Sequence, residues 1–391
     1  MLLVAPPGTT AIRLAAERVL RERAWRLASS PAAADLLAHC GPLPSPAPEW
    51  LTTLHSQLPA SGDLVALPTP ESVATGLDAA PVRPEPREPR TDARAGHGTH
   101  SGHDAHAGHR MEGMAERGDD RDGLRLDRWH LAWGPGLADW PGGLVLRVRA
   151  QGDVVQEARA DLADGASGSG SAGDGVGPYW SGPWTRAARG ERVERAEAER
   201  HRCAAHLDSL GRLLAVAGWA DQAARARRLR DAVLAARPGG PPLDPAVPVR
   251  IRALTRRVRR SRTLRWLTRG LGPLPSARAR ALGIMGPALL AATRGEGDVH
   301  ARVRVWLEET DATLGALDDH EPLTPGPFTG PRGTLGQPAP SAALLAAVPE
   351  TLAGTEFACA RLVLASLDPD PDELTGAGAP LAAGVRGPSD G

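Results

Sequence analysis

The second half of the chain repeats apolar residues at alternating spacings of three and four, and this pattern constrains the fold more than any other feature. Three stripes show it: Cys203, Leu207, Leu210, Leu214 and Ala217; Val299, Val303, Trp306, Thr310, Leu314 and Leu317; and Ala353, Phe357, Ala360, Leu364 and Leu367. Residues at this spacing share one face of an α-helix, and such faces pack together in a bundle. With further helices expected over 220–235 and 249–269, the sequence predicts a bundle of roughly five helices.

The N-terminal segment shows a different pattern. Residues 10–28 predict a helix that ends before Pro31, and residues 34–40 read as a buried strand. A second helix over 50–58 and a second strand over 63–67 follow. This alternation of helices and strands predicts a small α/β unit over residues 1–68.

Three more segments complete the expected organisation. Residues 69–123 are rich in Pro, Glu, Arg, Gly and His, which is typical of a disordered linker. Residues 143–150 and 154–158 alternate in polarity and predict a β hairpin, which opens a unit over 124–373 that also contains the bundle. Residues 374–391 are expected to be a disordered tail. The predicted fold class is therefore α+β, mainly α: an α/β unit, a His-rich linker, a hairpin sheet and a helical bundle.

Composition excludes several classes of function. The 46 basic and 46 acidic residues give zero formal net charge, so no global field attracts nucleic acid, and no nucleic-acid partner is expected. The cysteines Cys40, Cys203 and Cys359 lie far apart, which argues against a disulfide framework and an iron–sulfur cluster. No apolar run reaches the ~20 residues of a transmembrane segment. The sequence predicts a cytoplasmic protein, with a peripheral place at the inner face of the cell membrane as the alternative.

Histidines recur at every third position within the linker, at His97, His100, His103, His106 and His109. Imidazole binds Ni and Zn well, and a flexible chain can bring several rings onto one ion. The entropic cost of ordering that chain limits the affinity. We therefore expect weak Ni or Zn binding here, with a low-complexity linker as the alternative, and no tightly bound cofactor.

Nine arginines lie between residues 250 and 269. Because all 46 basic residues of the chain are arginines, the stretch is interpreted first as one solvated helix face over a buried stripe of Ile251, Leu254 and Val258. Contact with an anionic partner, either nucleic acid or phospholipid, is the alternative.

Two adjacent motifs carry a resemblance to a known superfamily. The sequence Leu-Gly-Ile-Met-Gly-Pro at 282–287 is followed by Gly-Asp-Val-His-Ala-Arg at 297–302, and Asp298 is expected to cap the next helix. This order resembles the quinone-site large subunit of the respiratory NADH dehydrogenase (complex I) and the large subunit of nickel-iron hydrogenases. The likeness extends over roughly residues 124–373. In complex I the hairpin loop carries histidines that line the quinone cavity, but the loop at 136–141 here has none.

Four positions are equivalent to functional residues of the superfamily. Cys203 and His206 match the helix that follows the first metal-binding cysteine pair of hydrogenases. Asp370 and Glu373 stand where the hydrogenase Asp-Pro-Cys-x-x-Cys motif has its two cysteines. A nickel-iron centre needs thiolates, so the resemblance implies that this centre is lost. Residues 30–42 also resemble the iron–sulfur small subunit of complex I, without its cluster cysteines.

The sequence therefore favours a non-catalytic accessory or structural component related to the peripheral arm of a respiratory NADH:quinone oxidoreductase or a membrane hydrogenase. Other subunits of such a complex are the expected partners, and no catalytic activity is expected of the chain by itself. One alternative is an active quinone-site subunit, which a His and Tyr pair facing a cavity would support; Tyr179 is the only tyrosine. The other is a nickel- or zinc-handling protein that uses the His-rich linker.

Overall fold

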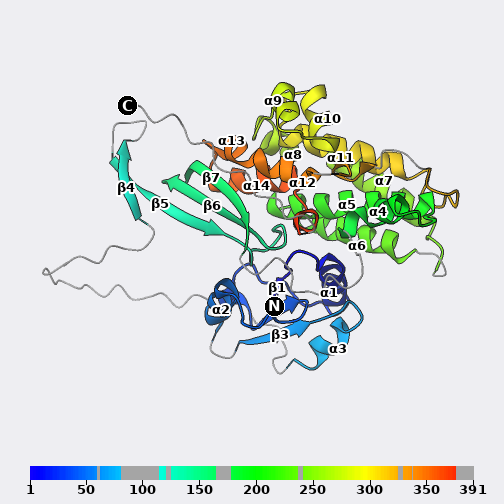
Figure 1. Ribbon diagram of the computed structural model, residues 1–391, viewed down its shortest axis with the longest axis horizontal. Helices are drawn as coiled ribbons and strands as arrows, with labels where there is room; N and C mark the ends of the chain where they lie inside the picture. The colour runs from blue at the N-terminus through cyan, green and yellow to red at the C-terminus, as the bar shows by residue number, and fades with distance from the viewer. Residues whose placement is uncertain are drawn as a thin grey trace, which may run out of the picture.

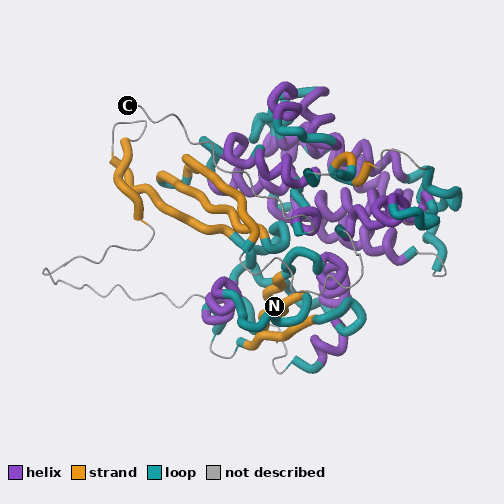
Figure 2. The backbone as a smooth tube through the Cα atoms, viewed as in Figure 1, coloured by secondary structure: helices purple, strands orange, loops and turns teal. Residues whose placement is uncertain are grey.

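The computed structural model describes residues 1–59, 62–80, 114–119, 125–163, 178–236, 241–324, 329–336 and 338–375. Its α+β, mainly α fold confirms the predicted class. An α/β unit from the N-terminus lies against the helical bundle, and an antiparallel sheet extends to one side of both (Figure 1, Figure 2). The five linker histidines, residues 97–109, lie outside the described residues.

The N-terminal unit is a three-layered α/β/α structure. Its elements are β1 (Leu2–Val4), α1 (Thr10–Glu22), β2 (Leu36–Cys40), α2 (Glu49–Ser56), β3 (Asp63–Leu67) and α3 (Val73–Asp78). The three strands are parallel in the order β1-β2-β3. Leu36 and Ala38 pack against α1 and α3, whereas Leu37 packs against α2. Strand β2 is buried on both faces, which explains its continuous apolar run.

Two elements of this unit differ from the sequence-based expectation. Strand β1 was not predicted, because three residues are too few to show a period. Helix α3 lies in the stretch that the sequence assigned to the linker. Its Val73 and Leu77 are one turn apart and bury themselves against α1 and the sheet, which holds this short segment in place.

The antiparallel sheet is larger than the predicted hairpin. Its strands are β4 (Met114–Asp119), β5 (Arg125–Trp133), β6 (Leu144–Gln151) and β7 (Val154–Leu162), in the order β4-β5-β6-β7. The β6–β7 pair is the expected hairpin, and Gly152 supplies the positive φ that its turn requires. Leu144, Leu146 and Val148 alternate onto the face that packs against the bundle.

The bundle is built around α5, which packs against α6, α11 and α14. Its helices are η2 (Tyr179–Ser181), α4 (Gly182–Ala188), α5 (Arg195–Val216), α6 (Ala220–Ala235), α7 (Ala246–Arg259), α8 (Arg262–Thr268), α9 (Ser276–Ala281), α10 (Gly286–Arg294), α11 (Val299–Thr313), α12 (Pro340–Ala346), α13 (Val348–Leu352), α14 (Phe357–Leu367) and η3 (Pro371–Leu374). A short hairpin joins β8 (Thr329–Gly330) to β9 (Gly333–Thr334). The stripes that begin at Cys203 and Val299 lie mainly on α5 and α11, as expected. The third stripe begins too early, because α14 starts at Phe357 rather than at Ala353, and the segment expected over 249–269 is divided into α7 and α8.

Two residues of the bundle, Asp298 and Trp180, bear on what the sequence predicts. Asp298 caps α11 as predicted, because its Oδ1 accepts a hydrogen bond from the Ala301 N–H at 2.7 Å. The Gly/Pro-rich sequence around Trp180 predicts a loop in which loss of the ring costs much less than loss of Trp306, but Trp180 is as deeply buried as Trp306 in the main core. Among the described residues, no helix is both long and apolar enough to cross a bilayer.

Candidate functional site at the junction of the two units

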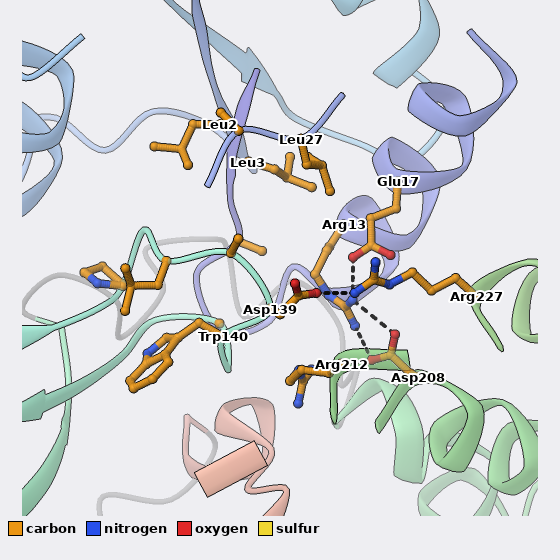
Figure 3. Close-up of a pocket in the computed structure, with 16 residues that line it drawn as sticks. Leu2, Leu3, Arg13, Glu17, Leu27, Asp139, Trp140, Asp208, Arg212 and Arg227 are labelled. Atoms are coloured by element: carbon orange, nitrogen blue, oxygen red, sulfur yellow. Dashed lines mark hydrogen bonds and ion pairs between the residues drawn. The ribbon is translucent and has the colours of Figure 1, made fainter. Parts of the chain in front are cut away.

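Buried charged side chains from three helices meet where the N-terminal unit contacts the bundle. Arg13 and Glu17 lie one turn apart on α1, and Arg13 Nη1 is 2.7 Å from Glu17 Oε1. Asp208 on α5 accepts a hydrogen bond from Arg13 Nη2 at 2.8 Å (Figure 3). Arg230 on α6 is fully buried; it donates to Glu17 Oε2 at 2.9 Å and also to Asp208. Two arginines and two carboxylates thus form a connected cluster, which we call the junction cluster, and Arg21, Arg212 and Asp231 pair with its members.

The pKa values show why these four groups stay charged. Burial alone would raise the pKa of the Glu17 carboxyl, but Arg230 and Arg13 outweigh it and lower that pKa to about 2. Asp208 follows the same pattern: despite burial, its arginine neighbours hold its pKa well below the usual range. In turn, the carboxylates raise the pKa of Arg230 above its ordinary value, against the effect of burial. Buried charges are tolerated only with such partners.

The network continues from the junction cluster into the C-terminal loop. Arg212, one turn after Asp208 on α5, donates to Asp368 Oδ1 at 3.2 Å. Asp368 also accepts a hydrogen bond from Ser209 Oγ at 2.7 Å and lies 2.9 Å from Arg332 Nη2. The loop that follows α14 is therefore held against α5 by charge-assisted bonds.

Asp370 and Glu373 lie in this same loop and are buried. Ser341 connects them: its Oγ accepts from the Asp370 N–H at 2.8 Å and donates to Glu373 Oε2 at 2.6 Å. Arg332 Nη1 lies 3.6 Å from Asp370 Oδ2. Burial, together with the negative charges of Asp372 and Glu373, raises the pKa of Asp370 well above its ordinary value, although Arg332 opposes the shift.

Cys203 and His206 both contact residues of α11 rather than the C-terminal loop. The Cys203 thiol is buried beside Thr313, and burial raises its pKa to about 12. His206 is buried as well, and its Nε2 lies 2.8 Å from Glu309 Oε2 on α11. Cys203 and His206 thus have different partners from Asp370 and Glu373. Within the described ranges, no three His, Cys, Asp or Glu side chains are grouped to hold a metal ion.

A small cavity of about 70 Å³ lies beside the junction cluster. Leu2, Leu27 and Trp140 line its apolar side, and Arg13 and Asp208 belong to its charged side (Figure 3). A buried water needs roughly 10–15 Å³ of such space, so the cavity has room for a few water molecules. The β5–β6 loop contributes residues 137–140 to its wall, which is the loop that the resemblance places at a quinone cavity.

The loop itself is fixed by its own bonds. Asp139 has a positive φ and forms an ion pair with Arg227 on α6. The Trp140 Nε1–H donates to the Leu144 carbonyl oxygen at 2.7 Å. These contacts attach the wall of the cavity to the bundle and to β6.

A His and Tyr pair exists, but it lies elsewhere. The rings of Tyr179 and His201 have centroids 5.4 Å apart, and burial lowers the pKa of His201 to about 4. Neither residue lines the junction cavity. A His and Tyr pair facing the cavity would support an active quinone site, but this pair does not line the cavity at the β5–β6 loop.

Sequence reasoning missed the junction cluster. Its local signals are the i, i+4 pairs Arg13/Glu17 and Asp208/Arg212. Neither pair predicts its long-range partners, because Asp208 meets Arg13 across 195 residues of chain. In chemical terms, the arrangement joins two folded units through buried ion pairs.

No protein-family model matches the chain, and no curated protein matches it. Among solved structures, one similar chain belongs to the membrane-bound sulfane sulfur reductase, an archaeal respiratory membrane complex. That match has a TM-score of 0.43 and 15% identity, and it covers 63% of this chain and 98% of the other.

Proposed function

We propose that the chain is a non-catalytic structural or accessory component of a membrane-bound oxidoreductase, related to the peripheral arm of NADH:quinone oxidoreductases or membrane hydrogenases. The observation that carries this proposal is the state of the two positions equivalent to hydrogenase metal ligands. Asp370 and Glu373 stand in place of the cysteines. Ser341 donates to Glu373 Oε2, whereas the Asp370 carboxylate accepts a hydrogen bond from the Asp372 N–H at 3.1 Å and lies 3.6 Å from Arg332 Nη1. Side chains used in this way stabilise a loop rather than leave coordination positions open.

The junction cluster supports the same proposal. Small-subunit-like and large-subunit-like parts of one chain are joined by buried ion pairs between Arg13, Glu17, Asp208 and Arg230. Such a cluster is costly to open, because separating the partners leaves buried charges unpaired. A fixed junction suits a structural role better than one in which a substrate enters between the two parts.

An active quinone-site subunit is the second candidate, because the β5–β6 loop lines a cavity with one apolar and one charged side. The cavity of about 70 Å³ would have to widen, since ligand pockets usually measure about 300–1,000 Å³. A quinone headgroup would therefore need movement of Trp140 or of the ion-paired Asp139.

The test measures whether the chain migrates with an active oxidoreductase complex and whether the activity of that complex depends on Asp370 and Glu373. The chain is tagged in its native host, and detergent-solubilised membranes are separated by native electrophoresis with stains for NADH dehydrogenase and hydrogenase activity. We expect the chain to comigrate with an active band, and the D370N/E373Q variant to comigrate with unchanged turnover. The purified chain alone should reduce neither quinone nor viologen dye. Turnover by the purified chain, or a comigrating but inactive D370N/E373Q complex, would overturn the non-catalytic role. A chain that migrates apart from both activities would overturn the role in such a complex.

A further inference from the structure

The positive charge of this neutral chain is concentrated in one segment. Residues 245–295 contain twelve arginines and no Asp or Glu. The segment includes α7 and α8, whose arginines are mostly exposed to solvent. A local excess of this size produces a positive field over one part of the surface, although the whole molecule is neutral.

Most of these arginines have no carboxylate partner among the residues that the structure describes. Arg259 pairs with Asp311, and Arg250 lies 3.8 Å from Asp244. Arg257 lies over the Trp219 ring, 5.8 Å from its centroid. No ion pair within the described ranges involves the remaining arginines of the two helices: Arg252, Arg256, Arg260, Arg262, Arg265 and Arg269. Their charge is therefore available to an external anion.

An exposed indole lies among these arginines. Trp266 is 81% exposed, the largest value among the exposed large apolar side chains. Arg262, Arg265 and Trp266 recur at i, i+3 and i+4, so they share one face of α8, and the exposed Arg269 caps the end of the helix. Leu264 and Thr268 lie on the opposite, buried face. The tryptophan is thus held at the surface rather than left there by a loose end of the chain.

Helix α7 repeats this combination. Val249 is 64% exposed, and Arg252, Arg256 and Arg260 follow it at helical spacings on the exposed side of the helix. Beside them is an open hollow of about 510 Å³, whose lining includes Arg256, Arg257 and Arg260. Three guanidinium groups around one hollow suit a phosphate group, because the planar fork of arginine matches phosphate oxygens.

We propose that this surface binds the anionic headgroups of a phospholipid membrane. We call it the basic face; it comprises Val249, Arg252, Arg256, Arg257, Arg260, Arg262, Arg265, Trp266 and Arg269. Arginines near an anionic lipid surface each strengthen binding by roughly fivefold. An indole prefers the boundary between headgroups and acyl chains, where its ring is apolar and its N–H remains hydrated.

A nucleic acid would satisfy the arginines equally well, but the apolar groups favour lipid. Val249 gains from burial at the acyl boundary and has no stacking partner on a nucleic acid, whereas Trp266 gains at the acyl boundary but could also stack on an unpaired base. The inference concerns the isolated chain, so it does not rest on the proposed function.

The test measures binding of the full chain to sedimenting vesicles. One vesicle is phosphatidylcholine alone, and the other is an equimolar mixture of phosphatidylcholine and phosphatidylglycerol. We expect binding to the mixed vesicle only, and weaker binding as salt rises. The R262Q/R265Q/R269Q variant should bind roughly a hundredfold more weakly, at about fivefold for each arginine. W266A should also weaken binding, and its loss should persist at high salt because it is apolar.

The matched control is R18Q/R147Q/R195Q, which removes the same net charge from exposed arginines outside the basic face. It should bind the mixed vesicle as the wild type does, and thermal melts confirm that both triple variants fold. Single R262Q and R265Q variants repeat the test if the triple variant unfolds. Equal loss in both triple variants would overturn the proposal, since general charge would then suffice. Binding to duplex DNA or RNA without vesicle binding would overturn it in favour of a nucleic-acid partner.

Discussion

Asp208 is the residue on which the junction cluster depends most. Its carboxylate contacts Arg13, Arg212 and Arg230, so Asp208→Asn would leave buried positive charge without its partner. We expect a loss of about 3–5 kcal/mol in the free energy of unfolding, measured by urea denaturation. Glu157→Gln is the control, because its pair with Arg149 is exposed and is expected to contribute at most about 1 kcal/mol. Equal effects of the two substitutions would show that the cluster adds no stability.

The three cysteines should differ in reactivity. Burial raises the pKa of both Cys40 and Cys203 to about 12, so neither forms the thiolate that an alkylating agent requires. Cys359 is only partly buried, and its pKa is raised less. Iodoacetamide should therefore modify Cys359 alone in the native protein and all three residues after unfolding, as read by mass spectrometry. Native labelling of Cys203 would contradict the packing of α5 against α11.

At the scale of elements, the sequence predicted what is periodic and missed what is not. The 3/4 stripes located α5, α11 and α14 because each carries a buried apolar stripe along several turns, although α5 and α14 are also buried on their other faces. Strand β1 was missed because it is short, and β5 because its charged residues hide the alternation. The junction cluster was missed for a different reason: its partners are far apart in the chain, and ion pairs leave no period in a sequence.

Trp180 illustrates how a local composition can mislead. Its Gly/Pro-rich surroundings predict a loop in which loss of the ring costs little, yet the 3₁₀ turn η2 holds the ring in the main core. Because Trp180 and Trp306 are equally buried, we expect Trp180→Ala and Trp306→Ala each to cost about 3–5 kcal/mol. Denaturant melts of both variants provide the comparison, with the exposed Trp266→Ala as control. A Trp180 variant as mild as the Trp266 variant would mean that η2 is not part of the core.

At the scale of the whole molecule, the charges are arranged in two opposite ways. Those at the junction are buried and paired across two units, whereas those of α7 and α8 are exposed and largely unpaired. Formal net charge alone hides this division, because the excess on the basic face is balanced by acidic residues elsewhere. Salt should therefore weaken contacts of the basic face while leaving the buried junction nearly unchanged.

The junction cluster should also make the two units unfold together in acid. Unfolded carboxyls titrate near pH 4, whereas the folded pKa of Glu17 is about 2 and that of Asp208 is also lowered. A lowered folded pKa gives stability that is complete above the unfolded pKa and is lost as pH falls through the folded one. We therefore expect urea midpoints to decline gradually below about pH 6.5, where His201 resists protonation in the folded state, and to fall steeply between about pH 4 and pH 2 as Glu17 and Asp208 titrate.

Arg230→Met separates this effect from general acid unfolding. Without Arg230, the pKa values of Glu17 and Asp208 should move back toward their unfolded values, so the variant should be less stable at neutral pH. Its stability should also depend less on pH between about 4 and 2, because folding then changes proton binding less. Hydrogen exchange read by mass spectrometry should show α1 and α5 losing protection in one step in the wild type. The shared cluster is contradicted if α1 opens at a pH where α5 stays protected, or if the variant keeps the acid dependence of the wild type.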